Sequence, residues 1–121
     1  MKKILIVDDM IVPLMIVENI LADKYQTFCA QSAEEAMEIY RKEKPDMILS
    51  ECTISDMTGY DLQIALQNEF HKKIPFMFMT ADSSEESENK AFDNGAMDFI
   101  HKPFKPEVLK RRVANILQLV E

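Results

Sequence analysis

Glycine and cysteine are scarce in this chain, and it has no long apolar run. The 121 residues include two Gly and two Cys, with 47% hydrophobic and 29% charged residues, which argues against a fibrous or disordered protein. No stretch approaches the roughly 18 uninterrupted apolar residues of a membrane span. The apolar run after Lys3 is too short for a secretory signal peptide and ends in two acids. We therefore expect one cytoplasmic domain over residues 1–121, without a membrane partner.

Basic residues are also few, with 14 Lys and Arg against 21 Asp and Glu, a net charge of -7. Nucleic-acid binding needs a basic surface, so direct contact with DNA or RNA is not expected. Cys29 and Cys52 lack CxxC spacing. We interpret them as reduced, buried thiols without a chemical role.

Short apolar runs alternate with helical apolar stripes, the pattern of repeated strand, helix, strand units. Five strands are predicted, at Lys3 to Val7, Thr27 to Ala30, Met47 to Ser50, Phe76 to Met79 and Asp98 to His101. The runs at 27–30 and 98–101 are the more polar and suit the edges. Right-handed crossovers then give an α/β fold, a doubly wound, five-stranded parallel sheet in the order 2-1-3-4-5, of the flavodoxin-like class.

Five helices are expected between and after these strands. The first carries Leu14, Val17, Ile20 and Leu21 on one face, with Pro13 in its first turn; the second runs from about Ala33 to Lys42, with Ser32 and Glu35 as a capping box. The third follows Gly59, carries Leu62, Ile64, Ala65 and Leu66, and ends near His71. The fourth has a second capping box at Ser83 and Glu86 and a stop at Gly95, and the fifth runs from Pro106 through Val108, Leu109, Val113, Ile116 and Leu117.

Polar residues end four of the predicted strands: Asp8 with Asp9, Glu51, Thr80 and Lys102. Parallel strands bring their carboxyl ends to one edge, so we expect these side chains to converge. Carboxylates suit a divalent cation such as Mg²⁺, while an ammonium and a hydroxyl suit phosphoryl oxygens. Each residue alone could be a cap, a turn residue or a solvated charge, but their common position favours a phosphoryl and metal site.

The chain resembles the receiver domain of bacterial two-component response regulators over almost its whole length. The matching segments are ILIVDD at 4–9, PDMILSE at 45–51 with Met57 and Gly59, MTA at 79–81, and GAMDFIHKPF at 95–104. This resemblance implies a non-enzymatic phosphorelay module whose phosphoacceptor, normally Asp, is at position 51. It implies Mg²⁺ binding by Asp8, Asp9, the acid at 51 and the backbone carbonyl of Thr53.

The same resemblance implies a conformational switch. Thr80 would turn toward the phosphoryl group, Lys102 would neutralise it, and the ring of Phe99 would move inward. The Lys102–Pro103 bond is usually cis in the family. A histidine kinase or a downstream protein, or a second copy in a homodimer, would bind the face of helix 4, strand 5 and helix 5, which includes Lys90, Phe99, His101, Lys105 and Arg112.

Two residues depart from the family pattern. Ser55 stands where the family has Pro, which predicts a less rigid loop after the third strand. Glu51 stands at the phosphoacceptor position, and its extra methylene moves the carboxylate by about an ångström, enough to slow in-line attack on phosphorus severely. The longer side chain reaches toward Thr80 and Lys102, and could imitate part of the phosphorylated state as a phosphomimetic.

Two functions follow from these residues and both stay open. One is a phosphorelay receiver, impaired in phosphorylation or biased toward its active form, with weak Mg²⁺ binding. The other is a pseudo-receiver that binds its partner constitutively without phosphoryl transfer. A haloacid dehalogenase phosphatase would need a DxD motif at Asp8, and a flavodoxin would need a hydroxyl-rich loop after the first strand; the chain has neither.

Overall fold

The computed structural model describes residues 1–81, 85–93 and 95–119. Five parallel strands form one sheet in the order β2-β1-β3-β4-β5, which confirms the predicted topology. The strands are β1 (Lys3–Val7), β2 (Gln26–Ala30), β3 (Met47–Glu51), β4 (Phe76–Thr80) and β5 (Asp98–His101). The helices are α1 (Ile11–Leu21), α2 (Ala33–Glu43), α3 (Gly59–Phe70), α4 (Glu85–Asp93) and α5 (Pro106–Leu119).

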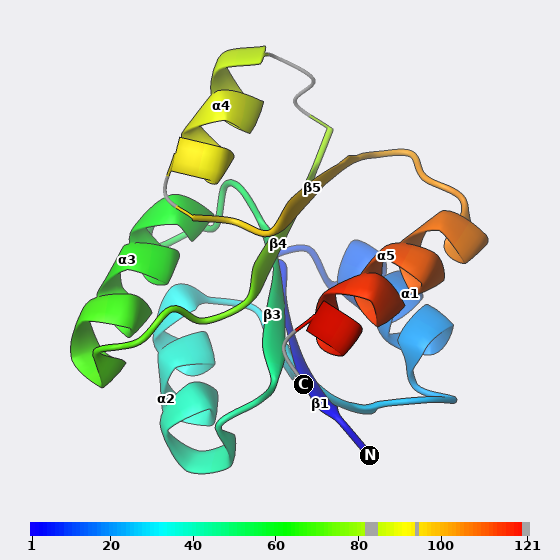
Figure 1. Cartoon of the computed structure of the whole chain (residues 1–121), viewed down its shortest axis with the longest axis horizontal. Helices are drawn as coiled ribbons and strands as arrows, with labels where there is room; N and C mark the ends of the chain where they lie inside the picture. Colours follow the sequence, from blue (N-terminus) through cyan, green and yellow to red (C-terminus); the bar gives the residue numbers. More distant parts are fainter. Residues whose placement is uncertain (82–84, 94, 120–121) are drawn as a thin grey trace.

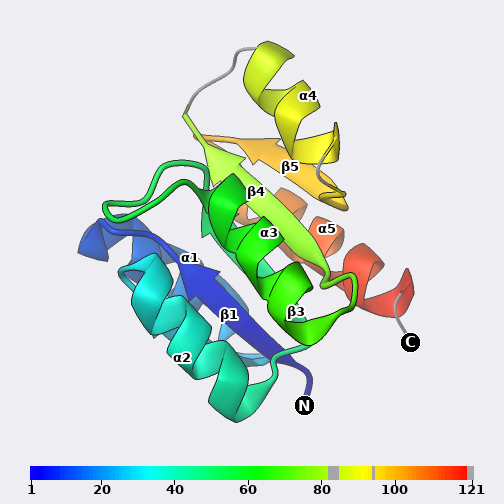
Figure 2. The ribbon, with the colours of Figure 1, turned by 90° about the vertical axis from the view of Figure 1, so that its left-hand side faces the viewer.

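Helices cover both faces of the sheet. Helices α1 and α5 lie on one face, and α2, α3 and α4 lie on the other (Figures 1 and 2). Strand side chains alternate between these faces, so each strand supplies both cores. Phe76 and Phe78 of β4 pack on the side of α2 and α3, whereas Met77 and Met79 pack on the side of α1 and α5. None of the described helices is long and apolar enough to cross a membrane.

Two of the predicted strands extend one residue further than expected at the carboxyl edge. Glu51 pairs with Met79, and Thr80 pairs with His101, so both are the last residues of strands rather than the first residues of loops. Backbone pairing therefore fixes the direction of their side chains. Strand β2 likewise begins one residue earlier, at Gln26, which pairs with Lys3.

The caps of the helices agree only in part with the predictions. The Ser32 hydroxyl accepts the Glu35 N–H at 3.1 Å, as predicted for α2. In a capping box the Glu35 carboxylate would also accept the N–H of Ser32. Here it accepts the N–H of Gln31 instead, one residue before the cap. Ser83, the expected cap of α4, lies outside the described residues. Gly95, with φ of 90°, follows the end of α4, as predicted.

The apolar stripe of α3 was predicted wrongly at one position. Leu62 and Leu66 are fully buried, but Ile64 is 41% exposed and Gln63 is 0% exposed. Successive helical residues are about 100° apart, so the face defined by Gly59, Leu62 and Leu66 takes in position 63 and excludes position 64. On α5, Val108 is partly exposed for the same reason, whereas the other four predicted residues are buried.

Candidate functional site

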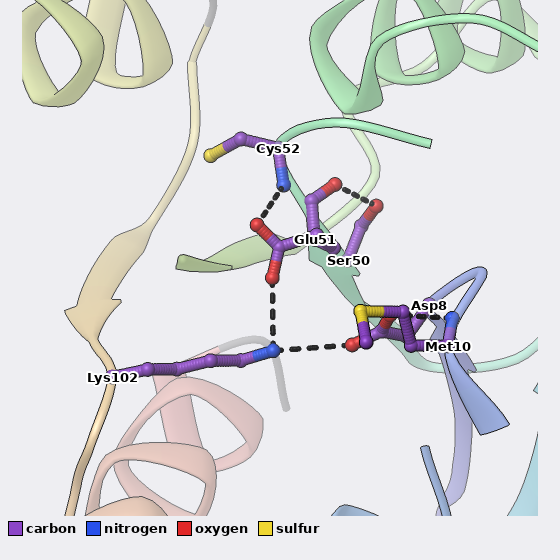
Figure 3. A network of polar contacts seen from close by, with 6 residues as sticks. All are labelled: Asp8, Met10, Ser50, Glu51, Cys52 and Lys102. Carbon is purple, nitrogen blue, oxygen red and sulfur yellow. Dashed lines mark hydrogen bonds and ion pairs between the residues drawn. The ribbon is translucent and has the colours of Figure 1, made fainter. Parts of the chain in front are cut away.

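Side chains from the ends of three strands meet at the carboxyl edge of the sheet. The ammonium of Lys102, which follows β5, lies 3.1 Å from Asp8 Oδ2 and 2.9 Å from Glu51 Oε2. Figure 3 shows the Lys102 side chain reaching across to both carboxylates. Asp8 and Lys102 are 94 residues apart in the sequence. The predicted convergence of acids and amine at one edge therefore occurs for these three residues.

The remaining oxygens of both carboxylates accept backbone N–H groups. Asp8 Oδ1 accepts the N–H of Met10 at 3.0 Å, and Glu51 Oε1 accepts the N–H of Cys52 at 3.3 Å (Figure 3). All four carboxylate oxygens of Asp8 and Glu51 consequently have a donor. These two backbone donors gave no signal in the sequence, because any non-proline residue supplies one.

Close packing of backbone holds Glu51 in position. The Ser50 hydroxyl donates to the Glu51 carbonyl at 2.8 Å, and the Gly59 N–H donates to the Cys52 carbonyl at 2.8 Å. A Cβ atom at Gly59 would overlap the Glu51 carbonyl oxygen and lie 2.8 Å from the Phe78 ring. Only glycine permits this approach of α3 to the end of β3.

Burial strengthens the electrostatic interactions of the cluster. The side chains of Asp8, Glu51 and Lys102 are 3%, 15% and 23% exposed. Burial by itself would lower the pKa of Lys102, but hydrogen bonds and charge interactions with Glu51, and then with Asp8, outweigh it, so the pKa is raised above its usual value of 10.5. Lys102 is therefore a cation at any physiological pH.

The contributions of the other predicted site residues, Asp9, Thr53 and Thr80, to the site remain predictions. Thr80 is buried at the end of β4, and its carbonyl accepts the Lys102 N–H at 2.8 Å. Asp9 is half-buried beside Asp8, and Thr53 is exposed and forms an isolated bridge with Thr58. Over residues 1–81, 85–93 and 95–119, no three His, Cys, Asp or Glu side chains cluster closely enough to hold a metal ion.

Phe99 points into the molecule. It is 4% exposed and belongs to the core on the side of α2, α3 and α4, so it does not contribute to the surface of the expected partner face. Two polar contacts border it: His101 Nε2 lies 3.4 Å from a Glu88 oxygen of α4, and Arg112 of α5 forms an ion pair with Asp98 at 3.0 Å. Lys105 is exposed, and the ammonium of Lys90 lies 5.1 Å from the Tyr60 ring centroid. The Lys102–Pro103 peptide bond is cis, as the family resemblance implied.

The loop between β3 and α3 is anchored by a residue that the sequence did not single out. The Asp56 carboxylate accepts the N–H groups of Ala33 and Glu34 at 2.8 and 3.0 Å, which caps the N-terminus of α2. These hydrogen bonds, the one from Ala33 first, lower the pKa of Asp56 below its usual value. The loop that contains Ser55 in place of proline is thus held by the contact of its Asp56 side chain with Glu34, which lies 22 residues earlier in the sequence.

Comparisons with known proteins identify the family of the chain. The family described as response regulator receiver domain matches residues 4–114. The chain is 34% identical over 116 residues to a probable cyclic di-GMP phosphodiesterase from Vibrio cholerae serotype O1, a match that covers 95% of this chain and 26% of that protein. It is 30% identical over 121 residues to the probable transcriptional regulator ycf27 of Porphyridium aerugineum, covering 99% of this chain and 50% of that protein. The chain therefore spans half or less of these two relatives.

Solved structures give the same result. The chemotaxis protein CheY4 of Vibrio cholerae superposes with a TM-score of 0.89 at 30% identity, covering 96% of this chain and 98% of that one. A two-component response regulator from Clostridium difficile superposes with a TM-score of 0.90 at 28% identity, covering 98% of this chain and 97% of that one.

Proposed function

The chain belongs to the response regulator receiver domain family, and we propose that it is a receiver in which Glu51 both impairs phosphorylation and biases the domain toward its active-like form. Domains of this family act in two-component signalling, where they interact with histidine kinases and downstream effectors. The proposed domain comprises residues 1–121. The observation that carries the proposal is the pairing of Glu51 with Lys102 at 2.9 Å.

Impaired phosphorylation follows from the position and the contacts of the Glu51 carboxylate. In-line attack on phosphorus needs a free lone pair aimed at the phosphorus atom, and a misplacement of about an ångström costs roughly a hundredfold in rate. Oε2 accepts from the Lys102 ammonium and Oε1 accepts from the Cys52 N–H. Each oxygen keeps a second lone pair, but these two contacts fix the direction in which that lone pair points, in addition to the displacement caused by the extra methylene.

The same contacts support a partial imitation of the phosphorylated state. The Glu51 oxygens occupy the donors that would otherwise hold phosphoryl oxygens, although a carboxylate carries one charge where a phosphoryl group carries nearly two. Phe99 is buried, which is the inward orientation that the family adopts on activation. We propose that its partner binds the face of α4, β5 and α5, through exposed residues such as His101 and Lys105.

Magnesium binding is proposed to be weak. The predicted ligands are Asp8, Asp9, Glu51 and the Thr53 carbonyl, but as they lie the two carboxylates at Asp8 and Glu51 do not fit a magnesium site, because Lys102 is bound between them. No step of the proposed function depends on the metal.

A second candidate is a pseudo-receiver, an interaction module that never accepts a phosphoryl group. The engagement of both Glu51 oxygens favours it, since the side chain already has the partners that a phosphoryl group would seek.

Intact mass spectrometry after incubation with acetyl phosphate and magnesium separates these functions. The wild type, Glu51→Asp and Glu51→Gln would be compared over one time course. We expect Glu51→Asp to gain one phosphoryl group and the wild type to gain none or to react far more slowly. A slow gain that Glu51→Gln abolishes identifies a receiver, and no gain identifies a pseudo-receiver. A wild type that reacts as fast as Glu51→Asp would refute the impairment.

Amide NMR spectra test the bias toward the active-like form. Glu51→Asp supplies both reference states, before and after treatment with acetyl phosphate. We expect the wild-type resonances of Thr80 and Phe99 to lie nearer those of the phosphorylated variant. Coincidence with the unphosphorylated variant would contradict the proposed bias while leaving the impaired phosphorylation intact.

A further inference from the structure

Lysines gather at the amino edge of the sheet, opposite to the acids at the carboxyl edge. All five strands are parallel, so they begin at the same edge. Lysine precedes β1 at position 2, β3 at position 44, and β4 at positions 72 and 73. The start of β1 and the ends of α2 and α3 lie at this edge (Figure 2). A hollow of about 280 Å³ opens there, and its lining includes Lys2, Lys44, Asp46, Lys72 and Lys73.

None of these four lysine ammonium groups forms an ion pair with a described residue. The neighbouring Arg41 differs, because it already binds the Glu69 carboxylate at 2.8 Å. Lys44 contacts neutral groups: its Nζ donates to the Arg41 carbonyl at 3.1 Å and lies 5.0 Å from the Phe70 ring centroid. The positive charge of the four lysines is therefore not balanced by direct contact with carboxylates.

Other charges around the hollow offset only part of this positive charge. Asp46 supplies one negative charge, and its carboxylate accepts the backbone N–H of Lys3 at 2.7 Å. Helices α2 and α3 end at this edge, and a helix C-terminus carries roughly half a negative charge. Asp46 and the two helix ends together offset roughly two of the four positive charges. A hollow lined by excess charge of one sign concentrates counter-ions, so this one favours a small anion with at least two negative charges.

The size and the lining of the hollow favour a diphosphate group. Ligand pockets usually have volumes of roughly 300–1,000 Å³, so a hollow of about 280 Å³ suits a small ligand. Lysine is a compact point charge that binds phosphate oxygens, and lysines on three separate segments can contact more than one phosphate. Tyr40 also lines the hollow, but it is 1% exposed, so it offers no ring face on which a nucleic-acid base could stack.

The backbone beneath the lysines is held in place before any ligand binds. Pro45 and Pro75 line the hollow, and the ring of each proline fixes its φ angle. The N–H of Asp46 donates to the Lys3 carbonyl at 2.7 Å, and the N–H of Ile48 donates to the Pro75 carbonyl at 2.9 Å. These bonds tie the segments before β3 and β4 to the sheet, so binding has to order side chains rather than backbone.

We infer that the amino-edge pocket, the hollow lined by Lys2, Lys44, Lys72 and Lys73, binds a diphosphate group through these four ammonium groups. The binding is non-covalent, needs no metal ion and involves no contact with a base. The inference does not rest on the proposed function, because the pocket lies at the edge of the sheet opposite to Glu51.

Calorimetric titration with inorganic diphosphate tests this on the full chain. The buffer has low ionic strength, to limit screening, and contains a chelator, so that no divalent ion can carry diphosphate to the acidic edge. One double variant is Lys72→Gln with Lys73→Gln. The matched control, Lys110→Gln with Arg111→Gln, removes two adjacent exposed cations of α5 and has the same net charge.

We expect the Lys72 and Lys73 variant to bind diphosphate about fivefold or more weakly than the wild type, the ratio that ~1 kcal/mol of lost charge interaction produces. The control should bind as the wild type does, because its cations lie outside the pocket. Equal weakening in both double variants would overturn the inference, and so would a wild type that does not bind diphosphate at millimolar concentration.

Amide NMR of the wild type locates the bound anion without any variant. We expect diphosphate to shift the resonances of Lys44, Asp46 and Lys72, while those of Asp8 and Lys102 stay unchanged. Shifts confined to Asp8 and Lys102 would refute the inference, because the anion would then bind at the carboxyl edge. A parallel titration with adenosine diphosphate should give a similar affinity. Much tighter binding of adenosine diphosphate would show that a base is recognised and would overturn the assignment to the diphosphate group alone.

Discussion

Replacement of Gln63 by methionine should stabilise the domain. Gln63 is 0% exposed within α3, and neither its Oε1 nor its Nε2 has a hydrogen-bond partner among the described residues. A buried polar group without a partner costs roughly 1–3 kcal/mol. Methionine has a similar length and helix propensity but no such group, so Gln63→Met should keep the packing and remove the cost.

The expected gain is about 2 kcal/mol, near the middle of that range, which for a chain of this size raises Tm by roughly 8 °C. The chain has no Trp, so urea unfolding would be followed by far-UV circular dichroism. The midpoint should rise without a change in the slope of the free energy against urea concentration.

Gln67 provides the matched control one turn further along α3. Its Oε1 accepts the N–H of Ile74 at 3.3 Å, so Gln67→Met should lower the free energy of unfolding by about 1 kcal/mol. A neutral or destabilising Gln63→Met, beside the expected loss in Gln67→Met, would refute the reasoning. It would mean that the Gln63 amide is hydrogen-bonded in solution.

Three further results are expected. Gly59→Ala should lower the free energy of unfolding by about 3 kcal/mol, because its Cβ would overlap the Glu51 carbonyl; a change under about 1 kcal/mol in urea unfolding would contradict this. Asp56→Ala should cost about 1 kcal/mol at neutral pH, because the N–H groups of Ala33 and Glu34 lose their acceptor at the N-terminus of α2 while Ser32 still caps Glu35. The pKa of Asp56 is lower in the folded protein than its usual value of 3.8, so this stabilisation is fully present above pH 3.8 and is lost as the pH falls through the folded-state pKa. The difference in the free energy of unfolding between Asp56→Ala and the wild type should therefore shrink in acid. Cys29 should resist alkylation at pH 8, since burial, and then the Glu18 carboxylate, raise its pKa to about 12; labelling as rapid as that of a free thiol would rule this out.

The order of the strands and the gathering of Asp8, Glu51 and Lys102 could be predicted because they follow from periodicity. Apolar runs give the strands, crossovers of one hand give their order, and parallel strands share a carboxyl edge. The exposed Ile64 and buried Gln63 show where apolar character alone misleads: the position on the helix decides burial, and the spacing of Gly59, Leu62 and Leu66 already contained that information.

Other features depend on contacts that no local pattern encodes. Asp56 accepts N–H groups of α2 from a loop more than 20 residues away, and the Glu35 carboxylate accepts the N–H of Gln31 rather than that of Ser32. The pairing of each carboxylate oxygen with its own donor likewise depends on side chain rotation, which strand ends alone do not determine. The sequence therefore predicted that Asp8, Glu51 and Lys102 meet, whereas the hydrogen bonds that each carboxylate accepts could be seen only in the structure.

The two proposed properties of Glu51 have one physical cause and should change together. Lys102 and the Cys52 N–H orient the carboxylate like part of a phosphoryl group, and in doing so they hold it away from the orientation that would attack phosphorus. A variant that frees these oxygens should gain reactivity and lose the active-like bias in the same step. Loss of the Lys102 ammonium should therefore weaken the imitation of phosphate, because the Glu51 carboxylate would then keep only the Cys52 N–H as an orienting donor.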